Sequence, residues 1–406
     1  MKADKSVVNS INKRNILEIV RNTAQISRVE LAQQTNLSLP TVMKLVDEFI
    51  AKDLILDAGS GVSTGGKPPK LLKFNYRSHY IIGVDINSSR IDVVLMDMAA
   101  NVICDQIRDV GKNYSAKQVI QYVIVLIESL LQSSGISGEM ILGIGIGIEG
   151  MVDTHKGAVR QMPAFGWKDI NVTTPIWERF GLPVVVDNDT RAMAMGEKLV
   201  GIACGIENFI CVNVSYNVDA ALVLNGNLFY GTGFSAGEAG HMTVEKNGAL
   251  CECGRRGCLN TVATPRAIER EARAAAAGLK GGQVTQILDM VYGHLDWINL
   301  YTLIDATENG DQLGVSIMKR AADYIGMAIM NMVCMFNPQM VIVEGKIMRN
   351  SQVFMQELRD KLEKEKRFLP NSAFTLELAS LGKHLCAIGA ASFILNGFIE
   401  SGGDAW

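Results

Sequence analysis

The chain has 406 residues, of which 48% are hydrophobic and 20% are charged, and its formal net charge is −3. This length exceeds what one ordinary hydrophobic core holds, so two or three globular domains are expected. No segment approaches the roughly 18 uninterrupted apolar residues of a bilayer-spanning helix. No apolar block follows the basic residues at the N-terminus, as a secretory signal would require. The sequence therefore predicts a cytoplasmic protein without membrane insertion.

The charges are distributed unevenly along the chain. Residues 1–76 contain eleven basic and seven acidic residues, a net charge of +4, whereas the remaining 28 basic and 35 acidic residues give −7. A basic head on an acidic body indicates that only the head meets a polyanion.

The head has the pattern of a helix-turn-helix. The apolar positions of "NSINKRNILEIVRN" predict an amphipathic helix that Asn9 or Ser10 could cap. Ser27, followed three residues later by Glu30, predicts a capping box for a second helix. Ser38 can cap a third helix, "SLPTVMKLVDEFIAKD". In this motif the start of the third helix enters the major groove of DNA.

A hairpin is predicted next, with strands at 54–56 and 71–74. Its tip, "GSGVSTGGKPPK", contains four glycines, two prolines and two lysines. Such a narrow cationic tip suits the minor groove of A·T-rich DNA, so residues 1–76 read as a winged helix-turn-helix. A flexible linker or a three-helix protein-interaction module is the alternative. The predicted DNA contacts are Arg28, Ser38, Thr41, Lys44, Lys67 and Lys70.

From Tyr80 onward, strands and helices alternate. "YIIGVDINSSRIDVVL" and "NFICVNVSYNVDAALVL" share one rhythm of strand, polar turn and strand, which predicts a duplicated unit. The alternation implies mixed α/β lobes with helices on both faces of each sheet. Long helices are predicted at 115–134, 264–278, 311–336 and 385–398, and the apolar "MAIMNMVCMF" could serve a core or a dimer interface.

The segment "GHMTVEKNGALCECGRRGC" brings His241, Cys251, Cys253 and Cys258 close together in sequence. One nitrogen and three sulfurs are the tetrahedral set that a structural Zn²⁺ takes. Their spacing in a cytosolic chain favours a metal over free thiols. Because the protein would fill all four positions, a structural zinc is predicted rather than a catalytic one. A zinc ribbon for nucleic acid is the alternative.

"AGEAGHM" followed by "CECGRRGCL" resembles the signature of the ROK family. That family comprises sugar kinases with a two-lobe actin-like (ribonuclease H-like) α/β fold, and repressors of the N-acetylglucosamine, xylose or glucose type with a winged helix-turn-helix in front. "GIGIEGMVD" and "GWKDINVTTPIWERFGLPVVVDND" extend the resemblance over nearly the whole chain. It implies a head at 1–76, a first lobe at 77–195 with the C-terminal helix 385–400, and a second lobe at 196–384 with the zinc site.

The resemblance also implies roles for single residues. In the family, the residues matching Glu238 and His241 bind sugar hydroxyls, and the histidine ligates zinc through its other ring nitrogen, which would fix its orientation. Those matching Asn188 and Asp189 complete the sugar pocket, with the aspartate as general base in the kinases. Asn260 stands where a sugar-binding glutamate is usual, and it could suit another hydroxyl pattern, a phosphorylated sugar or an N-acetyl group.

Three glycine-rich turns through which backbone amides approach phosphate in the kinases are changed. They read "DINSS" from Asp85, "SYNVDAA" from Ser215 and "EGK" from Glu344. A carboxylate about 4 Å from a phosphate costs on the order of 4 kcal/mol at a protein surface. ATP binding is therefore expected to be lost, with Asp189 a vestigial base. A kinase with an unusual phosphoryl donor is the alternative.

Together these features predict a DNA-binding regulator, a repressor of sugar uptake or metabolism genes, and not an enzyme. Its expected partners are double-stranded operator DNA, a sugar or sugar phosphate, and a second or further copies in a homodimer or homotetramer. Sugar binding would change the lobe angle and the spacing of two heads. Alternatively, the pocket is vestigial and a protein partner controls the repressor, or Glu238 and Asn188 are polar groups satisfied inside the fold.

Overall fold

The computed structural model describes residues 5–61, 68–111, 114–279, 285–367 and 374–404. It contains two compact units, Met1–Ala192 with Cys386–Trp406, and Met193–Leu385. The chain passes between them twice, within α6 (Asp189–Val200) and at the start of α14 (Leu385–Glu400). We call them unit 1 and unit 2. The mixed α/β architecture predicted from the sequence is confirmed, and the division into three domains stays a prediction.

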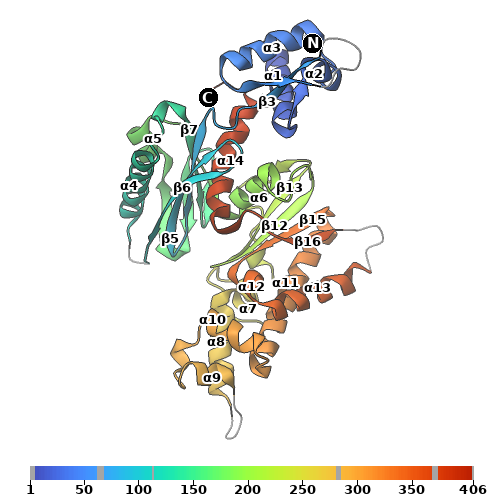
Figure 1. The fold of residues 1–406 in the computed structure, drawn as a ribbon. Helices are drawn as coiled ribbons and strands as arrows, with labels where there is room; N and C mark the ends of the chain where they lie inside the picture. The colour runs from blue at the N-terminus through green and yellow to red at the C-terminus, as the bar shows by residue number, and fades with distance from the viewer. Residues whose placement is uncertain (1–4, 62–67, 112–113, 280–284, 368–373, 405–406) are drawn as a thin grey trace. The chain divides into compact units, whose positions relative to one another are not determined.

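The head at the N-terminus consists of three helices and a small antiparallel sheet (Figure 1). The predicted capping box is confirmed, since the backbone N–H of Glu30 donates to Ser27 Oγ at 3.2 Å and that of Ser27 to Glu30 Oε2 at 2.8 Å. Ser38 caps the third helix as predicted. The elements are α1 (Lys5–Asn22), β1 (Ile26–Ser27), α2 (Arg28–Thr35), α3 (Leu39–Ala51), β2 (Ile55–Ser60) and β3 (Lys70–Phe74).

Two details of the head differ from the sequence prediction. α1 begins at Lys5, so Asn9 and Ser10 lie inside the helix and the predicted cap there is wrong. The residues before Asn9 include no glycine or proline, and a capping preference of about 1 kcal/mol does not stop a helix whose sequence permits it to continue. The two-residue strand β1 was not predicted, because it is too short to show an alternating pattern.

The first lobe, in unit 1, has a five-stranded sheet of order β11-β7-β4-β5-β6. In this sheet β4 pairs antiparallel with β5 and parallel with β7. Helices α4 and α5 cover one face, and α14 packs on the other (Figure 1). The bounds are β4 (Tyr80–Ile86), β5 (Arg90–Asp97), β6 (Val102–Asp109), α4 (Ala116–Ser134), β7 (Ile141–Ile148), β8 (Met151–Asp153), β9 (Ala158–Met162), β10 (Trp167–Asn171), α5 (Thr173–Phe180) and β11 (Val184–Asn188).

Gly83 of β4 and the alternating glycines of β7 allow α14 to approach the sheet closely. A Cβ on Gly145 would lie 1.9 Å from the carbonyl oxygen of Ala390, and one on Gly83 would lie 2.0 Å from that of Ala387. The isoleucines between the glycines of β7 are buried on the opposite face. Because successive side chains of a strand alternate between faces, "GIGIG" leaves the α14 side of β7 without side chains.

α14 is apolar along its length. Within the described ranges, Gly382–Glu400 is the one helical stretch long and apolar enough to cross a bilayer, and 72% of its apolar window is buried inside the fold. Packing of a core helix against a sheet explains this composition.

The residues that follow α14 complete the core of the head. Gly403 adopts a φ of +77°, and a Cβ there would lie 2.8 Å from Leu54 Cδ1. The Asp404 carboxylate pairs with Lys52 and lies 3.5 Å from Lys13 Nζ. One end of α14 therefore lies against the central strands of the first lobe, and the other end is anchored in the head.

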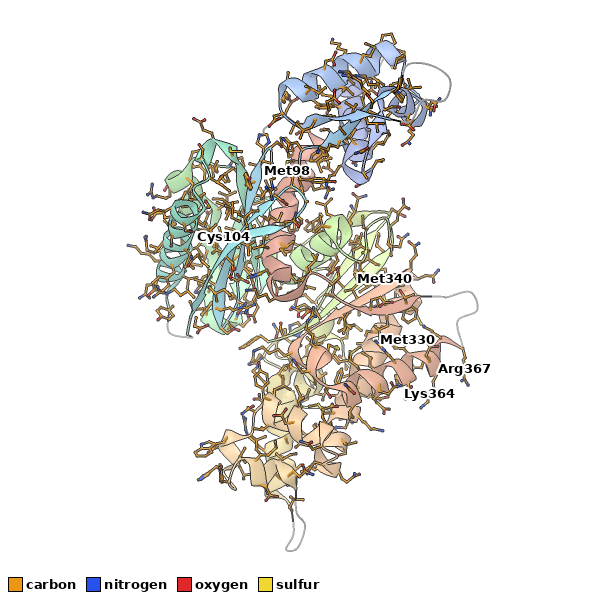
Figure 2. The ribbon with its side chains drawn as sticks, in the orientation of Figure 1. Met98, Cys104, Met330, Met340, Lys364 and Arg367 are labelled. Atoms are coloured by element: carbon orange, nitrogen blue, oxygen red, sulfur yellow. The ribbon has the colours of Figure 1, made fainter. Side chains whose placement is uncertain are left out.

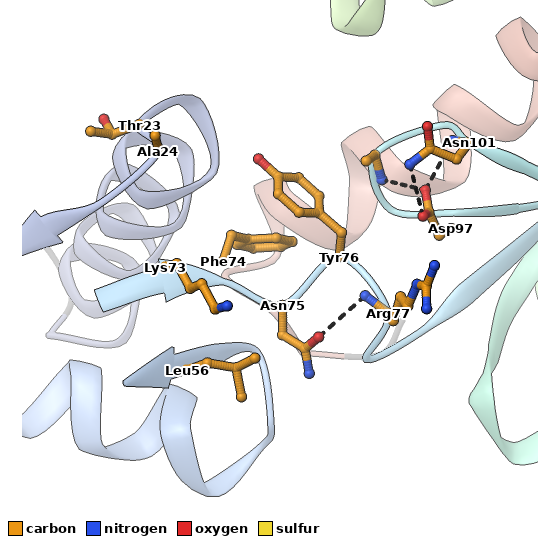
Figure 3. Close-up of a pocket in the computed structure, with 11 residues that line it drawn as sticks. Thr23, Ala24, Leu56, Lys73, Phe74, Asn75, Tyr76, Arg77, Asp97 and Asn101 are labelled. Carbon is orange, nitrogen blue, oxygen red and sulfur yellow. Dashed lines mark hydrogen bonds between the residues drawn. The ribbon is translucent and has the colours of Figure 1, made fainter. Parts of the chain in front are cut away.

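The head and the first lobe are also joined by the residues between β3 and β4, beside a pocket of about 370 Å³ (Figure 3). The Tyr76 hydroxyl donates to the carbonyl oxygen of Arg21 at 2.6 Å, and its ring centroid lies 5.1 Å from that of Phe74. The side-chain amide of Asn75 donates to the carbonyl oxygen of Asp53 at 2.9 Å. Polar groups that line the pocket thus hold this joint together.

Unit 2 repeats the sheet of the first lobe. Its order is β14-β13-β12-β15-β16, with the same succession of antiparallel and parallel pairs, as the duplicated sequence pattern predicts. Met330 of α11 and Met340 of β15 are buried in this unit (Figure 2). The bounds are β12 (Phe209–Val214), β13 (Val218–Leu224), β14 (Asn227–Leu228), α7 (Asn260–Ala263), α8 (Pro265–Ala277), α9 (Gln286–Met290), α10 (Leu300–Glu308), α11 (Gln312–Phe336), β15 (Met340–Glu344), α12 (Lys346–Asn350), α13 (Gln352–Lys366) and β16 (Thr375–Leu378).

Glu197 of α6 is fully buried, and its carboxylate accepts four hydrogen bonds. Oε1 accepts from the backbone of Ser380 at 2.6 Å and of Leu381 at 3.2 Å. Oε2 accepts from the backbone of Ile202 at 2.9 Å and from the Ser380 hydroxyl at 2.7 Å. This carboxylate ties the residues after α6 to those before α14, close to both points where the chain passes between the units.

We expect Glu197→Gln to lower the free energy of unfolding by about 2 kcal/mol, because an amide NH₂ in place of one oxygen leaves buried donors unsatisfied. The exposed Glu178 of α5 provides the control, and Glu178→Gln should change stability by less than about 0.5 kcal/mol. Urea denaturation followed by circular dichroism measures both changes. Equal stability of the two variants would show that the four bonds are not a stabilising network.

Candidate effector site, metal site and DNA-binding head

The four predicted metal ligands come together in unit 2. The loop that carries the cysteines folds back on itself, with Gly254 and Gly257 at φ values of +85° and +71°. The ligand atoms of the four residues lie within 4.8 Å of one another, and the set consists of His241, Cys251, Cys253 and Cys258.

The distances in this cluster suit one tetrahedral ion. His241 Nδ1 lies 3.7 Å from Cys251 Sγ, and Cys253 Sγ lies 3.7 Å from Cys258 Sγ. Metal–sulfur bonds of about 2.3 Å at tetrahedral angles place sulfurs roughly 3.8 Å apart. A hydrogen bond from the backbone of Arg255 lowers the pKa of Cys253 to about 6, whereas burial raises the pKa of Cys258 to about 12, so Cys253 is the cysteine that favours the thiolate before a metal binds. The cluster could therefore bind a metal ion.

His241 faces the sulfurs with one ring nitrogen and Glu238 with the other. Its Nε2 lies 4.0 Å from Glu238 Oε2, whereas Nδ1 is the atom beside Cys251. The side chains of Glu238 and His241 are 35% and 28% exposed, so both are accessible to a solute. The guanidinium of Arg255 donates to the His241 carbonyl oxygen at 2.9 Å and steadies its backbone. Unit 2 thus presents an acceptor and an imidazole side by side.

Asn260 holds the turn between β12 and β13. Its side-chain oxygen accepts from the backbone of Val218 at 2.8 Å, and its amide donates to Asn217 Oδ1 at 3.3 Å. A sugar contact by Asn260 stays a prediction, and it would have to be made alongside these bonds.

Asn188 and Asp189 belong to unit 1, at the point where β11 ends and α6 begins. Asn188 caps the helix, because its side-chain oxygen accepts from the backbone of Arg191 at 3.1 Å, and its amide donates to the Gly150 carbonyl oxygen at 3.0 Å. Asp189 is 4% exposed and accepts from the backbone of Thr190 at 2.8 Å. The carboxyl end of a parallel strand is where ligands bind in such sheets.

Three buried carboxylates lie close together in unit 1, those of Asp85, Glu149 and Asp189. Burial and the negative charges of Glu149 and Asp85 raise the pKa of Asp189 to about 8. Burial also raises the pKa of Asp85 to about 6, although a hydrogen bond with the Cys386 thiol opposes the rise. At neutral pH Asp189 is therefore mostly protonated. Its carboxyl group can then donate a hydrogen bond.

Glu149 and Cys386 were not among the site residues predicted from the sequence, and Asp85 was noted only as the start of a phosphate motif. Glu149 follows β7 directly, and a polar residue just after an apolar strand is a signal that could have identified it. Cys386 gives no such signal, because only the packing of α14 brings it to Asp85.

In the first of the three changed turns, side-chain oxygens accept hydrogen bonds from the backbone amides. Asn87 Oδ1 accepts from the backbone of Ser89 at 3.0 Å and of Arg90 at 3.1 Å. The amide of Ser88 donates to Glu149 Oε2 at 3.0 Å. A phosphate at this turn would have to displace these bonds.

In the other two turns, which belong to unit 2, side chains pair with one another. The Arg266 guanidinium lies 3.7 Å from the ring centroid of Tyr216, in the turn that Asn260 holds. In the third turn, Arg349 Nε donates to Glu344 Oε1 at 2.8 Å.

In the head, two of the predicted DNA contacts have acidic partners. Arg28 Nη2 lies 2.8 Å from Asp47 Oδ1, and Lys70 Nζ lies 3.2 Å from Asp57 Oδ2. Exposed ion pairs of this kind contribute about 0–1 kcal/mol, so a phosphate can replace the carboxylate at small cost.

Three of the four remaining predicted DNA contacts, Ser38, Thr41 and Lys44, lie on or beside α3. The hydroxyls of Ser38 and Thr41 are 2.8 Å apart at the cap of the helix. Lys44 is exposed. Lys67 lies outside the described residues. A contact of any of the six with DNA stays a prediction.

The profile of the ROK family matches residues 81–396, and that of a winged helix-turn-helix DNA-binding family matches residues 10–55. The chain belongs to the ROK family. It is 27% identical to the xylose repressor of Bacillus subtilis over 98% of both chains. It is 25% identical to the dual regulator NagC of Escherichia coli K12, over 97% of this chain and 95% of NagC.

Solved structures of ROK proteins confirm the predicted fold. A ROK transcriptional regulator described as a homolog of the E. coli MLC protein has a TM-score of 0.83 at 23% identity, with 98% of both chains covered. The Streptomyces griseus ROK glucokinase, solved with glucose and AMPPNP, has a TM-score of 0.67 at 25% identity, over 77% of this chain and 98% of the kinase. The winged head and the kinase-like, actin-type body of the ROK family are therefore both present.

We expect this ROK protein, when purified without chelators, to carry about one metal ion per chain. Cys251→Ser with Cys258→Ser should remove the ion and lower the melting temperature by several degrees, since structural metal sites contribute folding energy. Cys334→Ser, at an exposed cysteine elsewhere in unit 2, is the control and should change neither value. Elemental analysis and thermal melts provide the measurements. Full stability of the double variant without metal would contradict a structural role.

A second expectation concerns pH. Because the pKa of Asp189 is raised from 3.8 to about 8 in the fold, the folded state holds a proton that the unfolded state releases, and this group makes the protein less stable as pH rises through that window. Asp189→Asn should remove this part of the pH dependence. The difference in free energy of unfolding between the variant and the wild type should therefore be about 1–3 kcal/mol more favourable to the variant at pH 8 than at pH 5. Asp109→Asn, at an exposed site of β6, is the control. Parallel pH profiles of wild type and Asp189→Asn in urea denaturation would exclude the raised pKa.

Proposed function

We propose that this ROK protein is a transcriptional repressor that binds operator DNA through its head and responds to a sugar or sugar phosphate bound by its body. The observation that carries the proposal is the double orientation of His241, with one ring nitrogen beside Cys251 and the other beside Glu238. The winged head and the similarity to named repressors over nearly the whole chain support it. The protein would act in the cytoplasm, where its operator lies.

The metal would be zinc, because three thiolates and one imidazole are a set that zinc takes in structural sites. His241, Cys251, Cys253 and Cys258 would hold it. All four positions are filled by the protein, so the ion would supply orientation and stability. With Nδ1 of His241 committed to the ion, its Nε2 carries the proton and can donate to a sugar hydroxyl.

Sugar recognition would use both hydrogen-bond donors and hydrogen-bond acceptors. Glu238 accepts hydrogen bonds from hydroxyls and His241 donates. Asp189, which the ROK resemblance assigns to the same pocket, is mostly protonated near pH 7 and can donate as well. The side chain of Asn188 is already bonded to Arg191 and Gly150, so it would mainly position α6 and Asp189.

The response would reach the head through α14. Asp85, a charged neighbour of Asp189, is hydrogen-bonded to Cys386 at the start of α14. The tail of the same helix packs on Leu54 and pairs with Lys52 in the head. A change in the charge or position of Asp189 on sugar binding would shift α14 and, in a homodimer or homotetramer, the spacing of the heads.

Phosphoryl transfer is not part of the proposal. Side chains and backbone groups of the protein engage the amides of the first two phosphate turns, and Glu344 is paired with Arg349 in the third. Without a donor site, Asp189 would keep a role in binding only. A kinase with another phosphoryl donor predicts turnover of ATP or polyphosphate in the presence of a sugar, and control by a protein partner predicts a stable complex and no sugar response.

The proposal is tested by operator binding of the full chain, measured by fluorescence anisotropy against a panel of pentoses, hexoses, amino sugars and their phosphates. One chemical class should change the dissociation constant by at least about tenfold, which corresponds to a coupling of about 1.4 kcal/mol. Glu238→Gln should lose this response while retaining its DNA affinity without sugar. Glu207→Gln, at an exposed glutamate of unit 2, should respond like the wild type. An affinity that no sugar alters would exclude sensing by this site.

A further inference from the structure

The outer face of α3 is apolar at the end that approaches DNA. Leu39 is 41% exposed and Met43 is 47% exposed, in the first two turns of the helix. The opposite face is buried in the head and consists of Val42, Leu45, Val46 and Phe49. Leu39 and Met43 therefore do not belong to the core of the head and are available for a contact outside it.

Apart from Lys44, the same helix lacks the side chains that read purines by paired hydrogen bonds. Guanine is read mainly by arginine or lysine, and adenine by asparagine or glutamine. The sequence of α3, "LPTVMKLVDEFIA", contains no arginine, asparagine or glutamine. Arg28, on the neighbouring helix, is bonded to Asp47 of α3. Lys44 is the single basic residue of α3 and is exposed beside Met43.

The hydroxyls at the start of α3 are also engaged. Ser38 Oγ accepts from the backbone of Thr41 and lies 2.8 Å from Thr41 Oγ1. What the front of the helix offers to a groove is therefore the side chains of Leu39 and Met43, with one cation beside them. In the major groove, the apolar group that such side chains can cover is the C5-methyl group of thymine.

We propose that Leu39 and Met43 read thymine methyl groups in the major groove of the operator, so that α3 selects T·A pairs by apolar contact. The match of residues 10–55 to a winged helix-turn-helix family places α3 as the helix that enters the groove. This inference rests on the proposed function, because it assumes operator binding by the head. Lys44 would contact phosphate or a guanine edge beside the thymines.

The test first selects duplexes from a randomised library with the full-length protein. Single thymines of the selected site are then replaced by deoxyuridine, which removes only the methyl group. At one or two positions in each half-site this replacement should weaken binding by about fourfold, the effect of one buried methyl group. At thymines that the protein does not contact, the same replacement should leave binding unchanged.

A mutant cycle assigns the contact to a side chain. Met43→Ala and Leu39→Ala should each weaken binding to the thymine duplex by roughly three- to tenfold and reduce the uridine penalty at one position to less than twofold. Ile50→Ala is the matched control, since Ile50 is 39% exposed near the other end of α3 and should leave the penalty unchanged. Both tested side chains are exposed, so the variants are expected to fold, which circular dichroism verifies.

The possible results distinguish a failure of this inference from a failure of the proposed function. If no duplex is selected, the proposed function fails. If a duplex is selected and uridine is tolerated at every position, or the penalty persists in both variants, the protein binds DNA but does not read methyl groups through α3.

Discussion

The contact between α14 and the glycine-lined face of the first sheet is the constraint on which the rest of the molecule depends. A methyl group on Gly145 or Gly83 could not be accommodated, because it would lie within 2.0 Å of a helix carbonyl oxygen. At these two glycines the helix therefore rests directly on strand backbone, with no side chain between them that could repack. Close-packed interiors transmit displacement, so the Asp85 end of α14 and the Gly403 end should move together.

This arrangement couples the protonation of the buried carboxylates to the position of α14. Asp85, Glu149 and Asp189 are crowded so that the pKa values of Asp189 and Asp85 are raised. A hydroxyl that binds beside such a carboxyl group changes its pKa, because a hydrogen bond stabilises one of its two protonation states more than the other. The Cys386 thiol connects that balance to the helix that enters the head.

The features that could be predicted from sequence are those with a local cause. Ser27 and Glu30 are three residues apart and form a capping box with no help from the rest of the chain. The cysteine cluster and the duplicated strand pattern are local in the same sense. The contacts of Glu197 with Ser380, and of Cys386 with Asp85, join residues far apart in sequence, and no spacing indicates them. Asn260 was predicted to contact a sugar from its position in the ROK motif, and this stays a prediction. Its hydrogen bond to the turn between β12 and β13 could not be predicted, because it depends on neighbours in space.

The changed phosphate turns and the DNA-binding head can be understood together. A ligand shifts a conformational equilibrium only by its difference in affinity for the two states. A kinase uses closure around sugar and nucleotide to align them for transfer, and nucleotide binding would itself drive that closure. If the turns engaged by Asn87, Asn260 and Arg349 no longer bind nucleotide, as we propose, the sugar is the one small molecule of the pair that can favour a state. The head would then report sugar alone, whatever the level of ATP in the cell, and this independence is what a sensor of nutrient supply requires.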